Sequence, residues 1–343
     1  MKWRFIWAFF FLCSSCGEDG PPPRETSLLE SWEVKEVLTS WSFFPGSEIQ
    51  FINEWVGFRL DKSLQKLYKT TDAGRTYTPV FQLPNSSNPP ALFALDEQHL
   101  WLTTVRNDEE LQKSFAQIYR SIDGGNTWEI SERESAFFEM ISFVSPSRGF
   151  AYAIEYTGEY GDYFRLFQTE DGGATWGLAD VDMSKVNLKR ILWKTSELGF
   201  LGGWNGAEFR TLNGGRTWEP FRPNNSQTPS IFYPIDADQY YDMRFTETLK
   251  GDWSSEILTK LEQPIYILSQ SGQDIIGVLM EENCLPNAPC KNYLMSSTDG
   301  GKIWKKHFGL PLEEIFYLDQ EIQPGLVVIP DRYSAKVILI QKK

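Results

Sequence analysis

The sequence predicts an all-β fold, a single β-propeller most simply built from seven four-stranded blades. An octet of Thr or Ser, Asp or Asn, Gly and a closing aromatic residue recurs five times. Its Asp or Asn stands at positions 72, 123, 171, 213 and 299, so successive copies are 51, 48, 42 and 86 residues apart, and the last step is twice 43. Between the copies, short apolar segments alternate with turn residues, as in an antiparallel meander. One degenerate copy is therefore expected near residue 256.

The octet has the chemistry of a hairpin turn. An Asp or Asn side chain accepts hydrogen bonds from backbone N–H groups just ahead of it, and the Gly two residues later supplies a positive φ. The closing Trp is a large apolar plate suited to a crevice. Asn213 keeps the turn bond and removes the charge, which argues against calcium binding or acid catalysis. We predict a structural role for Asp72, Gly74, Asp123, Gly125, Trp128, Asp171, Gly173, Trp176, Asn213, Gly215, Trp218, Asp299, Gly301 and Trp304.

These octets resemble the Asp-box, or bacterial neuraminidase repeat, of Ser-x-Asp-x-Gly-x-Thr-Trp form. The resemblance runs from about residue 45 to the end and implies that each box lies between the third and fourth strands of a blade. The layout is similar to the photosystem II assembly and stability factor-like family, which includes many exported bacterial proteins. That resemblance implies a scaffold that binds another protein. We do not extend the resemblance to photosystem binding. In that family such binding is associated with a basic patch, and this acidic sequence gives no sign of one.

The first residues predict export. Met1–Arg4 is basic, residues 5–12 are apolar, and Ser14 and Ser15 precede Cys16. An apolar stretch this short indicates a secretory signal and not a membrane span. The segment resembles a bacterial lipobox, which implies cleavage after residue 15 and lipidation of Cys16. A plain cleaved signal peptide is the alternative, because Cys13 replaces the usual Leu.

Three parts of the chain follow from this reading: a signal peptide over 1–15, a proline-rich tether over 16–31 and the propeller over 32–343. Within the propeller, Cys284 and Cys290 enclose five residues. In an oxidising compartment the pair predicts a small disulfide-closed loop, with two free thiols as the alternative. A metal site is disfavoured because the chain has only two histidines. We predict neither metal nor cofactor.

Composition narrows the partners. The chain contains 13 Trp and carries a net charge of −13. The aromatic content is sufficient for a large core, and the negative charge speaks against nonspecific binding to nucleic acid or anionic lipid. The predicted partner is another protein of the cell envelope, with a glycan as the alternative and the lipid anchor as the only membrane link.

The two ends of the chain are expected to share a blade. Residues 32–38 form a lone strand, and residues 314–318, 325–329 and 335–340 offer three more, which together would close a seventh blade and hide the open edges. A unit without an octet extends from about residue 230 to 268. Six or eight blades are the alternatives.

Longer segments in three blades predict a binding face. The second, third and sixth blades carry extra residues, expected in the hairpin between strands two and three, on the face opposite the boxes. Tyr offers contact area with a polar tip and is favoured at recognition surfaces. The candidate binding face comprises Tyr156, Tyr160, Asp162, Tyr163, Tyr240 and Tyr241. A solvated acidic loop with its Tyr side chains packed on neighbouring blades is the alternative.

The sequence favours a protein without catalytic activity. Asp-boxes also occur in sialidases, which hold a substrate carboxylate with an arginine cluster. Here Arg59 lies in Phe-Arg-Leu-Asp, which lacks the Pro of the sialidase motif, and Arg120 and Arg210 directly precede boxes. Motifs for a serine nucleophile or a phosphate-binding loop are absent from the sequence. A sialidase-like or two-carboxylate glycosidase is the alternative.

Overall fold

The fold is described from a computed structural model. It covers residues 32–38, 47–84, 89–111, 113–134, 136–156, 162–183, 186, 188–203, 206–221, 231–243, 248–252, 257–280, 292–310, 321–323, 326–330 and 336–342. Every regular element among these residues is a β-strand. The all-β prediction is therefore confirmed for the described part of the chain.

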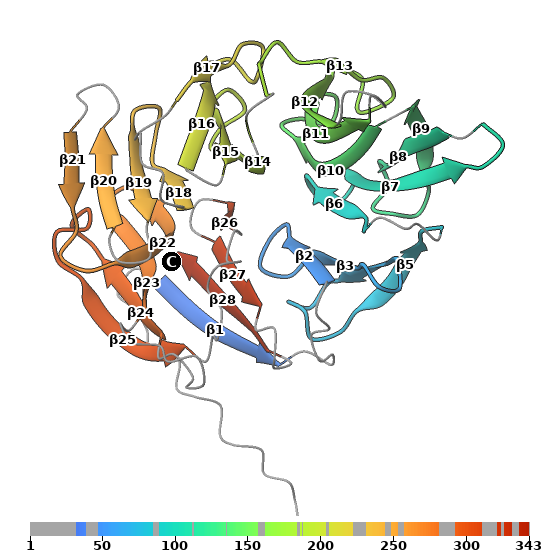
Figure 1. The fold of residues 1–343 in the computed structure, drawn as a ribbon. Coiled ribbons are helices and arrows are strands. Elements are labelled where there is room, and N and C mark those ends of the chain that lie inside the picture. The colour runs from blue at the N-terminus through green and yellow to red at the C-terminus, as the bar shows by residue number, and fades with distance from the viewer. Residues whose placement is uncertain are drawn as a thin grey trace, which may run out of the picture.

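The described strands form seven four-stranded antiparallel sheets, arranged around a common centre (Figure 1). Blade 1 comprises β2 (Ser47–Phe51), β3 (Gly57–Asp61), β4 (Lys66–Thr70) and β5 (Thr78–Gln82). Blade 2 comprises β6 (Ala91–Ala94), β7 (Leu100–Asp108), β8 (Lys113–Ser121) and β9 (Glu129–Glu134). Blade 3 comprises β10 (Ala136–Phe143), β11 (Gly149–Tyr156), β12 (Asp162–Thr169) and β13 (Gly177–Leu178).

The remaining blades repeat this order. Blade 4 comprises β14 (Leu188–Trp193), β15 (Gly199–Gly203), β16 (Gly206–Thr211) and β17 (Glu219–Pro220). Blade 5 comprises β18 (Ile231–Pro234), β19 (Gln239–Met243), β20 (Thr248–Asp252) and β21 (Ile257–Lys260). Blade 6 comprises β22 (Ile265–Ser271), β23 (Asp274–Met280), β24 (Asn292–Ser297) and β25 (Lys305–Leu310).

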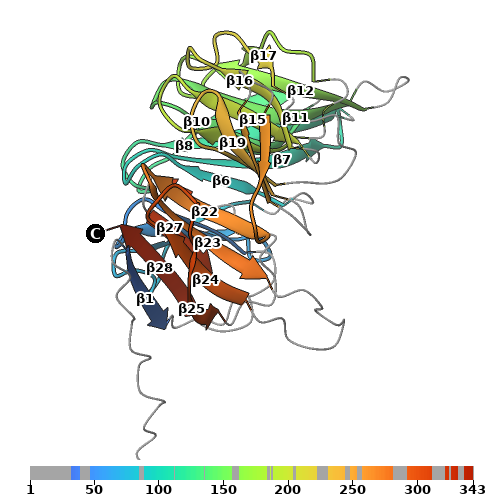
Figure 2. The same ribbon diagram turned by 90° about the vertical axis from the view of Figure 1, so that its left-hand side faces the viewer.

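Blade 7 joins the two ends of the chain, as predicted. It comprises β26 (Glu321–Gln323), β27 (Leu326–Pro330), β28 (Lys336–Lys342) and β1 (Trp32–Leu38), in the order β1-β28-β27-β26. β1 pairs with β28 from Trp32↔Lys342 to Leu38↔Lys336. Figure 2 shows the two strands side by side from a second direction.

One strand prediction needs correction. The unit without an octet ends with β21 at Lys260, and Leu268 belongs to β22 of blade 6. The error arises because short apolar runs mark strands without showing which sheet each strand joins. The strand predicted over residues 314–318 lies outside the described residues, and the strand paired with β27 is β26.

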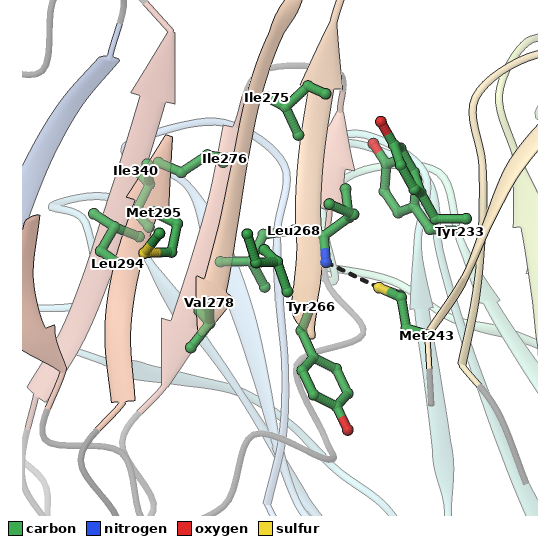
Figure 3. Packing of buried hydrophobic residues seen from close by; sticks show 13 residues of the cluster. Tyr233, Met243, Tyr266, Leu268, Ile275, Ile276, Val278, Leu294, Met295 and Ile340 are labelled. Carbon is green, nitrogen blue, oxygen red and sulfur yellow. Dashed lines mark hydrogen bonds between the residues drawn. The ribbon is translucent and has the colours of Figure 1, made fainter. Parts of the chain in front are cut away.

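The hydrophobic cores lie between neighbouring blades. The second strand of a blade is covered on both faces, and all five residues of β3 are buried. Between blades 2 and 3, the rings of Trp101 and Phe143 stack at 3.6 Å between centroids. Between blades 5 and 6, Met243 Sδ accepts a hydrogen bond of 2.9 Å from the amide of Ile267, where β22 carries a bulge (Figure 3). Neighbouring blades are therefore held together by apolar and aromatic packing and, between blades 5 and 6, by one hydrogen bond to a sulfur atom.

Candidate functional site

The five octets form one repeated turn, which we call the box turn. In blade 2, the Ser121 hydroxyl donates to Asp123 Oδ1 at 2.8 Å and accepts from the Gly125 amide at 2.8 Å. Asp123 also accepts from the Thr127 amide at 2.9 Å and the Thr127 hydroxyl at 2.6 Å. The carboxylate is thus occupied within its own turn, as the sequence predicted.

The other box turns repeat these bonds. Asp72 and Asp171 accept from the amide and the hydroxyl of Thr76 and Thr175, and Asp299 accepts from the Ile303 amide. Asn213 Oδ1 accepts from the Thr217 amide at 3.0 Å, which confirms that the amide side chain keeps the turn bond.

The box turns use the left-handed backbone region, which glycine adopts most readily. Gly124 and Gly125 have φ of 73° and 93°, and the corresponding glycines of the other boxes also have positive φ. Blade 1 has Ala73 at the first of these positions, with φ of 62°, a conformation that L-residues seldom adopt.

Hydrogen bonding sets the charge state of the box carboxylates. Bonds from the Thr127 hydroxyl and amide and from Ser121 lower the pKa of Asp123 to about 2. The equivalent bonds from Thr175 lower the pKa of Asp171 to about 2. A carboxylate with such a low pKa stays ionised and does not donate protons near neutral pH, which agrees with a structural role.

The closing Trp side chains also bond within their own turns in three blades. The Nε1 groups of Trp128, Trp176 and Trp304 donate to the carbonyls of Gly125, Gly173 and Gly301, each at 3.0 Å. Trp218 differs, because it is 9% exposed and packs edge-on against Phe150. These indoles therefore fix the outer turns to the blade cores.

A second capped turn, between strands one and two, was not identified from the sequence. Its Asn, Asp, Ser or Thr side chain accepts from an amide three residues later, and in most copies also from one two residues later. The capping residues are Asn53, Asp96, Ser145, Thr195 and Asp236. In blade 2 the box reaches this turn through the bond from the Gly124 amide to the Gln98 carbonyl, 3.0 Å. The sequence signal is a capping residue four positions before the second strand, or three in blade 5.

The hairpin face of blades 2 and 3 carries a cluster of charged and aromatic side chains. The extra residues of these blades lengthen β7 and β8 to nine residues each and β11 and β12 to eight each, as predicted for the hairpin between strands two and three. The corresponding strands of blade 1 have five residues. The longer strands carry their side chains beyond the level of the blade 1 hairpin.

We define the arginine cluster as Arg133, Glu155, Tyr163 and Arg165. Arg133 Nη2 lies 3.5 Å from Glu155 Oε1, and Arg165 Nε lies 3.6 Å from Glu155 Oε2. The Arg165 guanidinium lies over the Tyr163 ring, 5.0 Å from its centroid. The arginine side chains are 31% and 34% exposed, so solvent and ligands can reach them. Two cations thus share one carboxylate.

A second group on blade 2 is more evenly paired. Arg106 donates to Glu132 from Nε at 3.0 Å and to Asp108 from Nη1 at 3.1 Å, and its guanidinium lies 4.4 Å from the Phe115 ring centroid. Here two carboxylates surround one cation, the reverse of the ratio in the arginine cluster.

No protein-family model and no curated protein matches the chain. Solved structures do match. The structure of YCF48 bound to D1 peptide is 17% identical, with a TM-score of 0.59, and the match covers 91% of this chain and 96% of that one. YCF48 from Cyanidioschyzon merolae is 14% identical, with a TM-score of 0.52, over 91% and 98%. A family 74 (GH74) xyloglucanase from Xanthomonas campestris is 13% identical, with a TM-score of 0.51, over 81% of this chain and 47% of that one.

The chain has the fold of a photosystem II assembly factor-like propeller. YCF48 is such an assembly factor. Identities below one in five establish the fold, and function must be argued from the side chains of this chain.

The residues of the predicted binding face lie in different parts of this YCF48-like propeller. Tyr163 belongs to the arginine cluster, and Tyr156 and Asp162 are backbone partners in the pairing of β11 with β12. Tyr160 lies outside the described residues. Tyr240 and Tyr241 are 2% and 0% exposed, so their assignment to a binding face is wrong. Both lie on β19, the second strand of blade 5, which neighbouring blades cover on both faces.

The arginines weighed for sialidase chemistry are held separately. Arg59 is buried on β3 and pairs with Asp61 at 3.3 Å. Arg120 lies 3.6 Å from Glu129. Arg210 of blade 4 crosses to blade 5, where it donates to the Ala237 carbonyl and lies 3.1 Å from Asp238. Each therefore has a structural partner within or beside its own blade.

Other predicted features lie outside the described residues. These are the signal peptide, Cys16, the tether, and Cys284 and Cys290. The described residues contain no group of three or more His, Cys, Asp or Glu side chains placed to hold a metal ion. Within the same residues, no helix has the length and apolar character needed to cross a membrane.

Proposed function

We propose that this chain is a lipid-anchored propeller of the cell envelope that binds another protein and has no catalytic role. The arginine cluster carries the proposal, because it combines two accessible guanidinium groups, one shared carboxylate and an aromatic ring. Arginine and tyrosine are the residues most often found at the centres of protein interfaces.

The structural neighbours support this choice. One of them is YCF48 bound to D1 peptide, and it matches nearly the whole of both chains. The xyloglucanase supports the alternative, a carbohydrate-active propeller, but this chain spans about half of that enzyme. The observations therefore favour protein binding.

Crosslinking in the native cells, followed by affinity purification and mass spectrometry, tests the proposal. The wild type is compared with Arg133→Gln/Arg165→Gln. The control is Arg75→Gln, which changes an exposed arginine of a box turn that donates to the Asp72 carbonyl. We expect one specific envelope protein with the wild type and the control, and its loss with the double variant. The same result for all three proteins, or no specific partner, would contradict the proposal.

Membrane fractionation tests the anchor separately. Cys16→Ser removes the thiol that lipidation requires, and we expect the protein to move from the membrane fraction to the soluble envelope fraction. Cys13→Ser is the matched control and should remain in the membrane fraction. If Cys16→Ser also remains there, the lipid anchor is wrong, whereas protein binding stays open to the crosslinking test.

A further inference from the structure

Among the described residues, most of the outer edge of β12 in blade 3 has no strand paired with it. β12 has eight residues, but β13 pairs only with Phe167 and Gln168. In blade 2, by contrast, β9 pairs with six consecutive residues of the nine in β8, from Phe115 to Arg120. Within the described residues, the first part of β12 therefore has a strand partner only on its inner side, from β11.

The backbone groups on this edge can be assigned. The Leu166 carbonyl accepts from the Ala179 amide at 2.8 Å, so the peptide groups of Leu166 point outward. Because these groups alternate along a strand, those of Phe164 and Asp162 also point outward, whereas those of Tyr163 and Arg165 point to β11. The chain then turns at Ala179, whose carbonyl accepts from the Val181 amide at 2.9 Å. The donor and acceptor of Phe164 lie on the open side of β12.

Packing holds this edge in an extended conformation. The Phe164 ring stacks on Tyr152 at 5.6 Å between centroids and an interplanar angle of 8°. Tyr152 in turn donates to the Val186 carbonyl at 3.0 Å. A strand that is already ordered loses little entropy when a second strand pairs with it, which favours binding by strand addition.

The arginine cluster lies beside the same edge. Tyr163, Arg165 and Phe167 are two residues apart and therefore share one face of β12. The Arg133 guanidinium lies 4.2 Å from the Phe167 ring centroid. The Nε atoms of Arg133 and Arg165 are buried and have no hydrogen-bond partner among the described residues. Among the described side chains, Glu155 is the one carboxylate paired with these two guanidinium groups, which leaves one positive charge in excess. An acidic side chain would complement this charge.

We propose that the outer edge of β12 binds an extended, acidic segment of a partner protein as an added strand. The main chain of that segment pairs with Phe164, and one Asp or Glu side chain reaches Arg133 and Arg165. This inference rests on the proposed function and adds to it the binding mode and the chemistry of the partner. Open strand edges are recognised by main-chain pairing, while flanking side chains select the sequence.

Random dodecapeptides displayed on phage provide the first test. They are selected on the whole propeller, with counter-selection on Arg133→Gln/Arg165→Gln. We expect the enriched peptides to contain an acidic residue in a segment of high β propensity, and to bind Arg165→Gln about tenfold more weakly, as for the loss of one charge-assisted hydrogen bond. No enrichment, or enriched peptides without acidic residues, would overturn the inference.

Amide hydrogen exchange of the wild type then tests the binding mode. With an enriched peptide bound, the outward amides of Phe164 and Leu166 should become protected, whereas those of Tyr163 and Arg165, already directed to β11, should change little. Binding that depends on Arg165 but leaves the Phe164 amide unprotected would overturn strand addition while leaving the proposed function intact. Failure of the crosslinking test would instead overturn the proposed function.

A pair of variants separates the backbone from the side chain. Phe164→Pro removes the outward N–H without breaking the β11 ladder, and Phe164→Leu keeps it with a similar apolar side chain. We expect a further loss of affinity of about tenfold for Phe164→Pro relative to Phe164→Leu. Equal affinities in two folded variants would contradict pairing at Phe164, and the exchange measurement decides the matter if Phe164→Pro does not fold.

Discussion

The turn between strands one and two, here called the inner turn, is held differently in blade 5 and in the blades with box turns. In blades 2, 3, 4 and 6 a box glycine donates its amide to a carbonyl of the turn between strands one and two of the same blade. Blade 5 has no box, and the guanidinium of Arg210 reaches the corresponding turn from blade 4, at Ala237 and Asp238. A repeated main-chain bond within one blade is thus replaced by a single side chain from its neighbour. The box therefore serves to hold the inner turn of its own blade. Blade 5 lacks a box, and its inner turn is held by Arg210 of blade 4 instead.

The largest loss of stability is expected at Gly215, a box glycine of blade 4 that packs against Phe150 of blade 3. An added Cβ at Gly215 would lie 2.1 Å from Phe150 Cζ, and φ there is 81°. Gly215→Ala should therefore lower the free energy of unfolding by about 3 kcal/mol, from the clash and the left-handed backbone together. Gly272→Ala is the control, because φ is also positive but no atom lies within 4 Å of the added Cβ. It should cost about 1 kcal/mol in chemical denaturation. Equal costs would show that packing at the box contributes nothing.

The second effect concerns the side chain that serves blade 5. Arg210→Met should destabilise the protein by about 2 kcal/mol, because a largely buried side chain loses charged hydrogen bonds to Ala237 and Asp238. Arg120→Met is the matched change in blade 2, because Arg120 lies beside Gly172 of blade 3, where the turn between strands one and two keeps its own box bond from Gly172 to Ser147. It should cost less than about 0.5 kcal/mol. Thermal unfolding of both variants is the measurement, and equal losses would remove the distinction between the two kinds of blade.

A smaller change should strengthen a box. Ala73 holds φ of 62° where other boxes have glycine, so Ala73→Gly relieves that backbone. Since the Ala73 side chain is also 3% exposed, the variant loses some buried apolar surface. We expect a net gain of about 0.5 kcal/mol in the free energy of unfolding from denaturant titration. A loss of stability would mean that the methyl group outweighs the backbone strain.

The smallest effect is the pH dependence of the boxes. The pKa of Asp123 and of Asp171 is about 2, below the ordinary value of 3.8, so each carboxylate stabilises the fold above about pH 4 and loses this contribution as the pH falls towards 2. Asp123→Asn/Asp171→Asn should resemble blade 4, which carries Asn213, and should flatten acid unfolding between these pH values. Asp180→Asn, outside the boxes, is the control. An unchanged acid-unfolding curve in the double variant would contradict the prediction.

The box turns could be predicted because all their side-chain bonds close within eight residues, as those of Asp123 show. Tyr240 and Tyr241 were misassigned for the opposite reason: their burial depends on blades 4 and 6, which a local pattern does not specify. The arginine cluster was only partly visible, since Tyr163 was identified and Arg133 and Arg165 were not. Those two arginines meet at Glu155 through three strands, and no spacing in the sequence predicts that meeting. Arg210 had been noted for its position before a box, but its reach into blade 5 follows from the packing alone.

The pairing of β1 with β28 has a consequence for how the protein is made. β1 is the first strand of the fold to be synthesised and β28 is the last, so β1 has no partner until the chain is nearly complete. A contact between such distant positions carries a large entropic cost before it forms and slows folding. Blade 7 is therefore expected to be the last blade to form, and a chain shortened before Lys336 would leave β1 unpaired.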